Sequence, residues 1–103
     1  MILRDIAHVR TGDKGDTSQI AVFAYRAHDY PALLRVLTVE RIAAHLPNLP
    51  CRRIERFELP GLHALNFVLE GALAGGVTRS LVLDPHGKTL GAQLLDIPIL
   101  SEV

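Results

Sequence analysis

The sequence predicts an α+β protein with a ferredoxin-like split βαβ sandwich, an added N-terminal strand, and helices on one face of a mainly antiparallel sheet. Its elements follow the order β, β, α, β, β, α, β, and setting the first strand aside leaves the order of that fold. The chain has 103 residues, 49% of them hydrophobic and 21% charged. These values are ordinary for a folded protein, and we expect residues 1–103 to form one domain.

The N-terminal elements are two predicted strands separated by a polar run. Residues Ile2 to Val9 alternate loosely between apolar and polar side chains, which favours a strand. Ile20 to Tyr25 is almost wholly apolar and rich in branched and aromatic residues. This composition predicts a strand that is covered on both faces.

A helical region follows the second strand. We expect helix from Asp29 to Leu46, with a possible cap at Asp29 and apolar residues at helical spacing. Thr38 could instead cap a second helix, so one helix and two helices both fit the pattern. Pro47 and Pro50 prevent the helix from continuing.

The second half begins with strands at Arg52 to Leu59, near a sheet edge, and at Leu65 to Leu69. Three glycines within residues 71–76 predict a loop. Val77 to Leu83 reads as a strand, and Asp84 to Gly87 has the residues of a turn.

The last elements are short. Leu90 and Leu94 lie on one helical face, which favours a helix over residues 90–95 rather than the returning arm of a hairpin. Ile97 to Leu100 would be a final strand, at a sheet edge because Pro98 has no backbone N–H to donate.

Charge and cysteine content narrow the possible partners and the compartment. Eleven basic residues balance eleven acidic ones, so no global field attracts nucleic acid or a membrane surface. A net charge near zero also gives little protection against self-association, so we expect an oligomer or a partner protein. Cys51 is the single cysteine, and no apolar run reaches the length of a membrane span. We therefore expect a cytoplasmic protein.

The most unusual segment is the polar run from Thr11 to Gln19, which holds two glycines, hydroxyl and amide side chains and three charges. Its backbone N–H groups, together with Lys14, could bind an anion. The alternative is a polar connection in which glycines supply positive φ angles and aspartates bond the local backbone. The run matches neither a P-loop nor an EF-hand loop.

A second candidate segment is Gly75 to Ser80, where two glycines allow close backbone approach and Arg79 offers a fork for a carboxylate or phosphate. Arg79 could equally lie on the wet face of a strand. Taken together, the two segments form a hypothetical ligand site. Its residues are Gly12, Asp13, Lys14, Gly15, Thr17, Ser18, Gly75, Gly76 and Arg79.

No motif identifies a catalytic or metal centre. None of the five histidines lies in a zinc-binding spacing, so no metal or other cofactor is expected. His8, Asp13 and Ser18 could be imagined as a hydrolase set, but no nucleophile elbow supports it. We therefore assign no catalytic residues, and an enzyme that works alone is the less favoured interpretation.

Three segments in order resemble the AtuA-like ferredoxin-fold domain. They are Arg10 to Thr17, Glu58 to Phe67, and Gly75 to Leu81 with Asp84 and Gly87-Lys88. That domain is similar to the small C-terminal part of acyclic terpene utilisation (AtuA-type) proteins. The resemblance implies a ferredoxin-like architecture and an association with acyl-CoA or terpenoid catabolism.

Two functions follow as hypotheses. The first is an accessory domain that assembles with itself or with a larger AtuA-type or acyl-CoA-processing subunit. The second is an anion-binding or acyl-CoA-binding module that contributes to the active site of a larger enzyme. The first rests on the small size, the zero net charge and the lack of a catalytic constellation.

Overall fold

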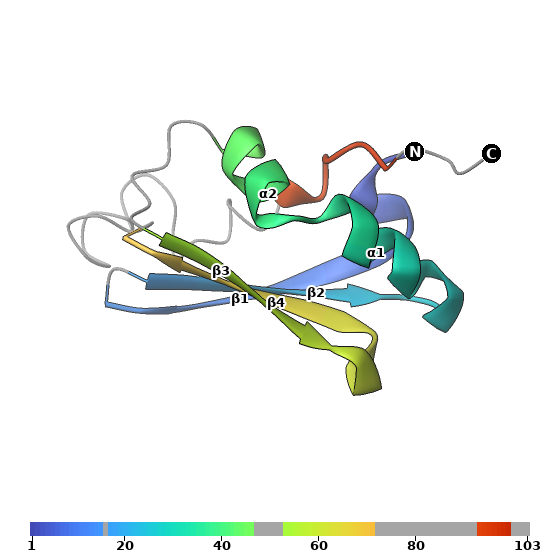
Figure 1. Ribbon diagram of the computed structural model, residues 1–103, viewed down its shortest axis with the longest axis horizontal. Coiled ribbons are helices and arrows are strands. Elements are labelled where there is room, and N and C mark those ends of the chain that lie inside the picture. The colour runs from blue at the N-terminus through green and yellow to red at the C-terminus, as the bar shows by residue number, and fades with distance from the viewer. Residues whose placement is uncertain (16, 47–52, 72–92, 100–103) are drawn as a thin grey trace.

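The structure, a computed structural model, describes residues 1–15, 17–46, 53–71 and 93–99. Within these ranges four strands form one antiparallel sheet, and two α-helices lie on one side of it (Figure 1). The strands are β1 (Ala7–Lys14), β2 (Thr17–Ala24), β3 (Arg53–Leu59) and β4 (Ala64–Glu70), and the helices are α1 (Tyr30–Val36) and α2 (Val39–His45). The predicted α+β class is confirmed.

The strand order β1-β2-β4-β3 contains one split βαβ unit. β4 pairs antiparallel with both β2 and β3, so β2 and β3 run in the same direction, and the two helices lie in the connection between them. The added N-terminal strand β1 pairs along the other side of β2. It therefore occupies the place beside β2 that a C-terminal strand takes in the usual ferredoxin-like order.

The first strand begins later than the sequence pattern indicated. Residues Leu3–Asp5 form a 3-10 turn instead, because the Asp5 carboxylate accepts a hydrogen bond from the Ile2 backbone N–H at 2.9 Å. Leu3 is fully buried in the core and anchors this turn. β1 then continues through the polar run as far as Lys14, so most of that run is strand rather than loop.

The helical region consists of two helices, which confirms the alternative in which Thr38 starts the second one. Its hydroxyl oxygen accepts a hydrogen bond from the Arg41 backbone N–H at 3.1 Å, an N-cap that satisfies one free donor of α2. Leu37, between the helices, has φ −89° and ψ 69°, which ends α1.

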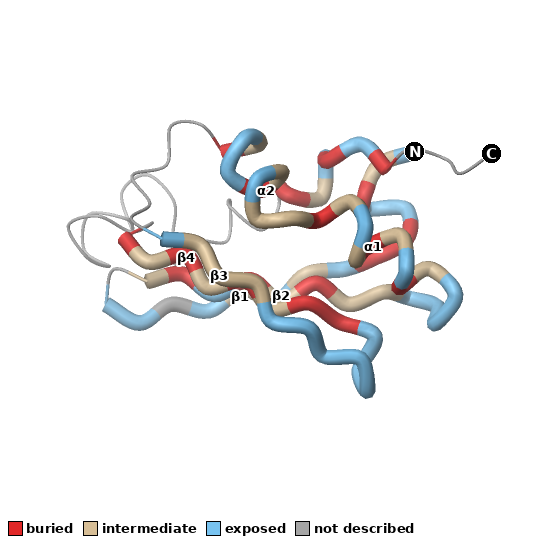
Figure 2. The backbone as a smooth tube through the Cα atoms, viewed as in Figure 1, coloured by how far each residue is buried: buried red, intermediate tan, exposed pale blue. Residues whose placement is uncertain are grey.

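The core lies between the helices and one face of the sheet (Figure 2). Every second residue of β2 and β4 is buried there, and the helices contribute their apolar stripes. The fully buried members include Ile20, Val22, Leu65, Phe67, Leu69, Leu33, Leu37 and Ile42. The expectation that β2 is covered on both faces is wrong, because its alternate side chains Ala21 and Phe23 are only partly buried.

The described C-terminal residues, 93–99, hydrogen-bond to the N-terminal residues and join the core formed by the helices and the sheet. Residues 93 and 94 are helical, and Ile97 and Ile99 are buried. Of the expected final strand, the described residues 97–99 form an antiparallel bridge between Pro98 and Ile2, in which neighbouring backbone groups donate and accept. The loop, strand and turn predicted after Gly71, at residues 72–92, lie outside the described residues.

Candidate functional site

The first candidate segment forms the β1–β2 hairpin. Lys14 pairs with Thr17, Asp13 with Ser18 and Gly12 with Gln19, so the two strands are joined through Gly15 and residue 16. Gly15 has φ +64°, a conformation that glycine adopts without steric cost. The polar run therefore forms a tight hairpin. Its Gly15 has the positive φ angle that we expected of a glycine if the run were a polar connection.

The hairpin divides its side chains between the two faces of the sheet. Because strand residues alternate, Lys14 and Thr17 lie opposite to the face on which Ser18 is buried. Ser18 is fully buried, and its hydroxyl has no hydrogen-bond partner among the residues that the structure describes. Lys14 and the Ser18 hydroxyl thus cannot contact one ligand from the same face.

The second candidate segment, with Gly75, Gly76 and Arg79, lies outside the described residues. Whether the two segments converge stays a prediction. The imagined set of His8 and Ser18 is not brought together, because His8 pairs with Phe23, five residues along β2 from Ser18. At the rise of a β-strand this is a separation of roughly 17 Å, with the two side chains on opposite faces.

The face of the sheet away from the helices, called here the outer face, carries an aromatic cluster at one end. The His8 ring stacks on Phe23, with ring centroids 5.1 Å apart, and on Tyr25 at 5.3 Å. Tyr25 is 61% exposed. These rings are therefore stacked against one another while still open to solvent.

Strand β3 extends this apolar end. Phe57 and Leu59 lie on the outer face and are 46% and 36% exposed, and Leu62 in the 3-10 turn that follows is 62% exposed. The sequence analysis did not predict that these apolar side chains are exposed. The alternation in residues 54–59 indicates a strand with two different faces, but it does not show which face the helices cover.

The other end of the outer face is charged. Lys14 and Thr17 pair there on one side, and Arg53 and Glu70 pair on the other. The Arg53 guanidinium donates to the Glu55 carboxylate at 2.8 Å. This end of the face therefore carries both signs of charge, next to the neutral aromatic end.

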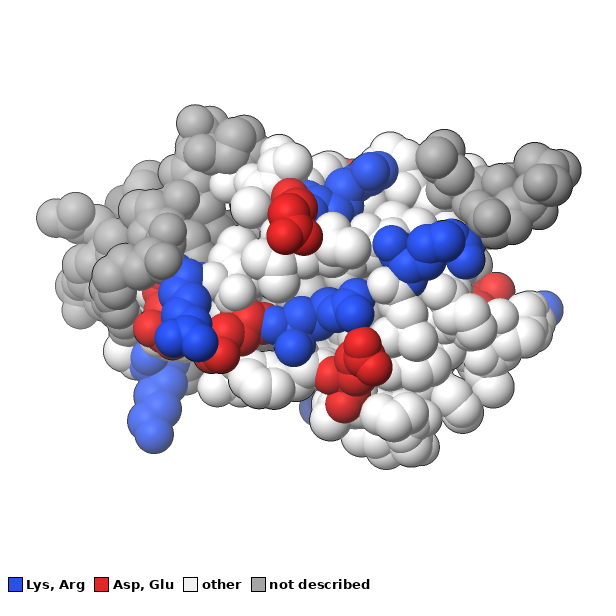
Figure 3. Space-filling model, viewed as in Figure 1, with Lys and Arg blue, Asp and Glu red and all other residues white. Residues whose placement is uncertain are grey.

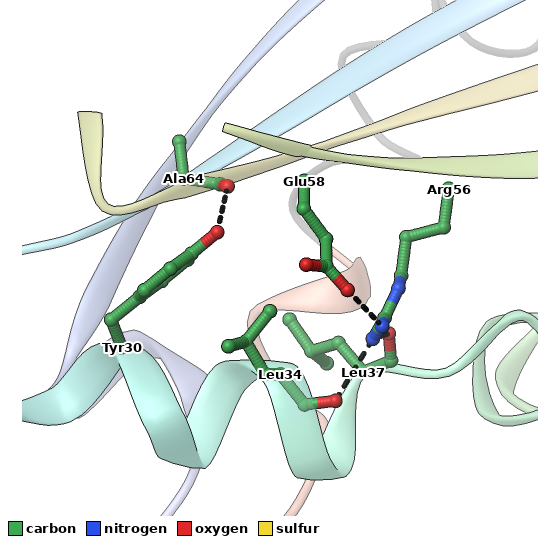
Figure 4. A network of polar contacts seen from close by, with 6 residues as sticks. All are labelled: Tyr30, Leu34, Leu37, Arg56, Glu58 and Ala64. Atoms are coloured by element: carbon green, nitrogen blue, oxygen red, sulfur yellow. Dashed lines mark hydrogen bonds and ion pairs between the residues drawn. The ribbon is translucent and has the colours of Figure 1, made fainter. Parts of the chain in front are cut away.

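A partly buried polar network fixes α1 on the opposite face (Figure 4). The Arg56 guanidinium donates to the backbone carbonyls of Leu34 at 2.9 Å and Leu37 at 3.1 Å, and to the Glu58 carboxylate at 2.9 Å. These carbonyls belong to the C-terminal end of α1, where acceptors lack partners within the helix. Arg56 therefore caps α1 from β3.

The helix side also holds an open hollow of about 560 Å³. Arg35 and Arg41 flank it, and Arg41 donates to the Pro98 carbonyl at 3.3 Å. The remaining lining is mixed, with Val36, Thr38, Glu40, Ala44 and Pro98. Figure 3 shows basic and acidic side chains interspersed over the visible surface rather than gathered into one charged patch.

Nowhere in the described ranges do three His, Cys, Asp or Glu side chains come close enough to hold a metal ion. None of the helices seen there is both long and apolar enough to cross a membrane.

Comparison with known protein families places the chain in a family. The model of the AtuA ferredoxin-like domain family matches residues 1–100, nearly the whole chain. No curated protein and no solved structure is similar enough to count as a match.

Proposed function

Because this chain belongs to the AtuA ferredoxin-like domain family, we propose that it is an assembly domain in a system for acyl-CoA or terpenoid catabolism. The link to catabolism rests on the AtuA name of the family. The single observation that carries the assembly role is the outer face, where large apolar side chains stay exposed beside stacked rings.

Exposed apolar side chains are common singly, but a contiguous group with a polar margin marks a contact surface. Here Tyr25, Phe57, Leu59 and Leu62 are all at least 36% exposed. Burying such side chains against another protein removes apolar area from water at about 25 cal/mol per Å². The proposal includes a cytoplasmic setting, which the single Cys51 supports.

The test is size-exclusion chromatography with light scattering, with the chain alone and together with a larger AtuA-type protein and the products of neighbouring genes. We expect an oligomer or a stable complex with one of them. A chain that stays a strict monomer and captures none of these proteins would contradict the assembly role.

A second function, the binding of an anion or acyl-CoA, is favoured by the hollow beside α1 and α2. Its volume lies within the usual range of ligand sites, and two guanidinium groups flank a mixed lining that holds apolar side chains and one carboxylate, that of Glu40. CoA thioesters at 100 times their Kd should stabilise the fold by about 2.7 kcal/mol. Thermal melting with Arg41→Gln as the matched variant tests this, and an unchanged Tm for the unmodified chain would exclude the site.

A further inference from the structure

The outer face carries opposite charges along its two sides. Strand β1 contributes Arg10 and Lys14, and Gly12 lies between them with no side chain. The opposite side, formed by β3 and β4, contributes the carboxylates of Glu55 and Glu70 against one guanidinium. One side is therefore basic and the other is acidic on balance, which makes the face complementary to itself.

The register divides this face into rows that run across the strands. One row joins His8, Phe23 and Ala64 to Leu59, and the next joins Arg10 through Ala21 and Asn66 to Phe57. A third row joins Gly12 through Gln19 and Val68 to Glu55. The apolar row, from His8 to Leu59, lies at one end of the strands. The charged row, with the pairs Lys14–Thr17 and Glu70–Arg53, lies at the other.

Two copies can stack face to face about a twofold axis that lies between the sheets. This axis runs either parallel or perpendicular to the strands. The parallel axis places β1 of one copy over β3 of the other and keeps each row over itself, so apolar end meets apolar end. The perpendicular axis places the apolar row over the charged one, with Leu59 over Arg53. Because burying charged groups against apolar ones is costly, the parallel axis is favoured.

We propose that two copies of this chain pair through their outer faces about an axis parallel to the strands. Glu55 of each copy then faces Gly12 of the other and lies between Arg10 and Lys14. This inference rests on the proposed assembly function, and the partner that it adds is a second copy of this chain.

Other cross-copy contacts follow from the same rows. Arg10 lies over the ring of Phe57, a cation–π geometry. Lys14 faces Arg53 of the other copy, which brings two positive charges together. The carboxylates of Glu55 and Glu70 next to Arg53 offset this repulsion. Aligned sheets interdigitate their side chains at a spacing of about 10 Å, so these long side chains can reach across.

The size of the face sets the strength of the pairing. Four strands about 4.8 Å apart and seven or eight residues long give a footprint of roughly 450 Å² per copy. The two copies together then cover roughly 900 Å², which is below the about 1,200–2,000 Å² that a standard stable interface buries in total. We therefore expect a dimer that dissociates on dilution.

The test is sedimentation of the full chain over a wide concentration range. Glu55→Lys and the double variant Arg10→Glu/Lys14→Glu each place like charges opposite one another, so each should raise the dissociation constant at least about tenfold. Combining all three substitutions reverses both partners and should restore the dimer. The matched control is Glu40→Lys on α2, which makes the same charge change on the helix side and should leave the dimer unchanged.

The outcomes separate this inference from the assembly role. Restoration in the triple variant supports the pairing. A chain that is monomeric at every concentration but is captured by a larger AtuA-type protein overturns the pairing and leaves the assembly role intact. A dimer that responds equally to Glu40→Lys and Glu55→Lys overturns the outer-face geometry, and a monomer that captures nothing overturns both proposals.

Discussion

The two faces of the sheet differ in how their polar groups are bonded and how far their apolar side chains are buried. On the helix face the core is buried, and the polar groups of Tyr30 and Arg56 donate to backbone carbonyls at 2.9 Å. On the outer face, aromatic rings stack with one another but stay exposed, and the charges pair at the margin. The difference shows that one face stabilises the fold, while the other leaves apolar area exposed to solvent.

The largest expected contrast between the faces is between two phenylalanines. Phe67 on β4 is fully buried, so Phe67→Ala should lower the free energy of unfolding by about 3–5 kcal/mol. Phe57 is 46% exposed, so Phe57→Ala should change it by less than about 0.5 kcal/mol. Urea denaturation measures both. Similar losses in the two variants would show that the outer face belongs to the core.

A smaller contrast is expected between two arginines of β3. Arg56→Met leaves the carbonyls at the end of α1 without their donor and should cost about 1–3 kcal/mol. Arg53 has a side chain that is 63% exposed, and Arg53→Met should cost less than about 1 kcal/mol. The readout is the midpoint of chemical denaturation. An Arg56 variant as stable as wild type would remove the capping role.

The smallest effect concerns the buried hydroxyl groups of the helix face. The Ser18 hydroxyl bonds to none of the described residues, so Ser18→Ala should leave stability unchanged or raise it by up to about 1 kcal/mol. The Tyr30 hydroxyl donates to the Ala64 carbonyl at 2.9 Å, so Tyr30→Phe should cost about 1 kcal/mol. Thermal melting compares the two. A clear loss of stability in Ser18→Ala would show that its hydroxyl is satisfied in solution.

Much of the local structure could be predicted because it depends on near neighbours. Thr38 supplies a capping oxygen to the N–H three residues ahead, so the start of α2 is readable as a local pattern. The apolar runs that became β2 and β4 were also readable. The start of β1 was not, because Asp5 and the burial of Leu3 against distant residues decide it.

The candidate site was harder to predict than the elements. The polar run was recognisable as unusual, but its division between two faces depends on pairing with β2. The exposed outer face could not be predicted from the sequence. An apolar strand has the same composition whether its second face is buried in the core or exposed. Ala21 and Phe23 therefore led to the wrong expectation of burial on both sides.

The sequence by itself determined the fold class, the helical region with Thr38 as a possible cap, and the apolar runs that form β2 and β4. Periodicity, capping and turn chemistry act over a few residues, so they can be read along the chain. Only the tertiary structure decided which face of the sheet the helices cover and which side chains share the outer face. The alternation of a strand has two equivalent faces, and only packing across long sequence distances makes one of them the core.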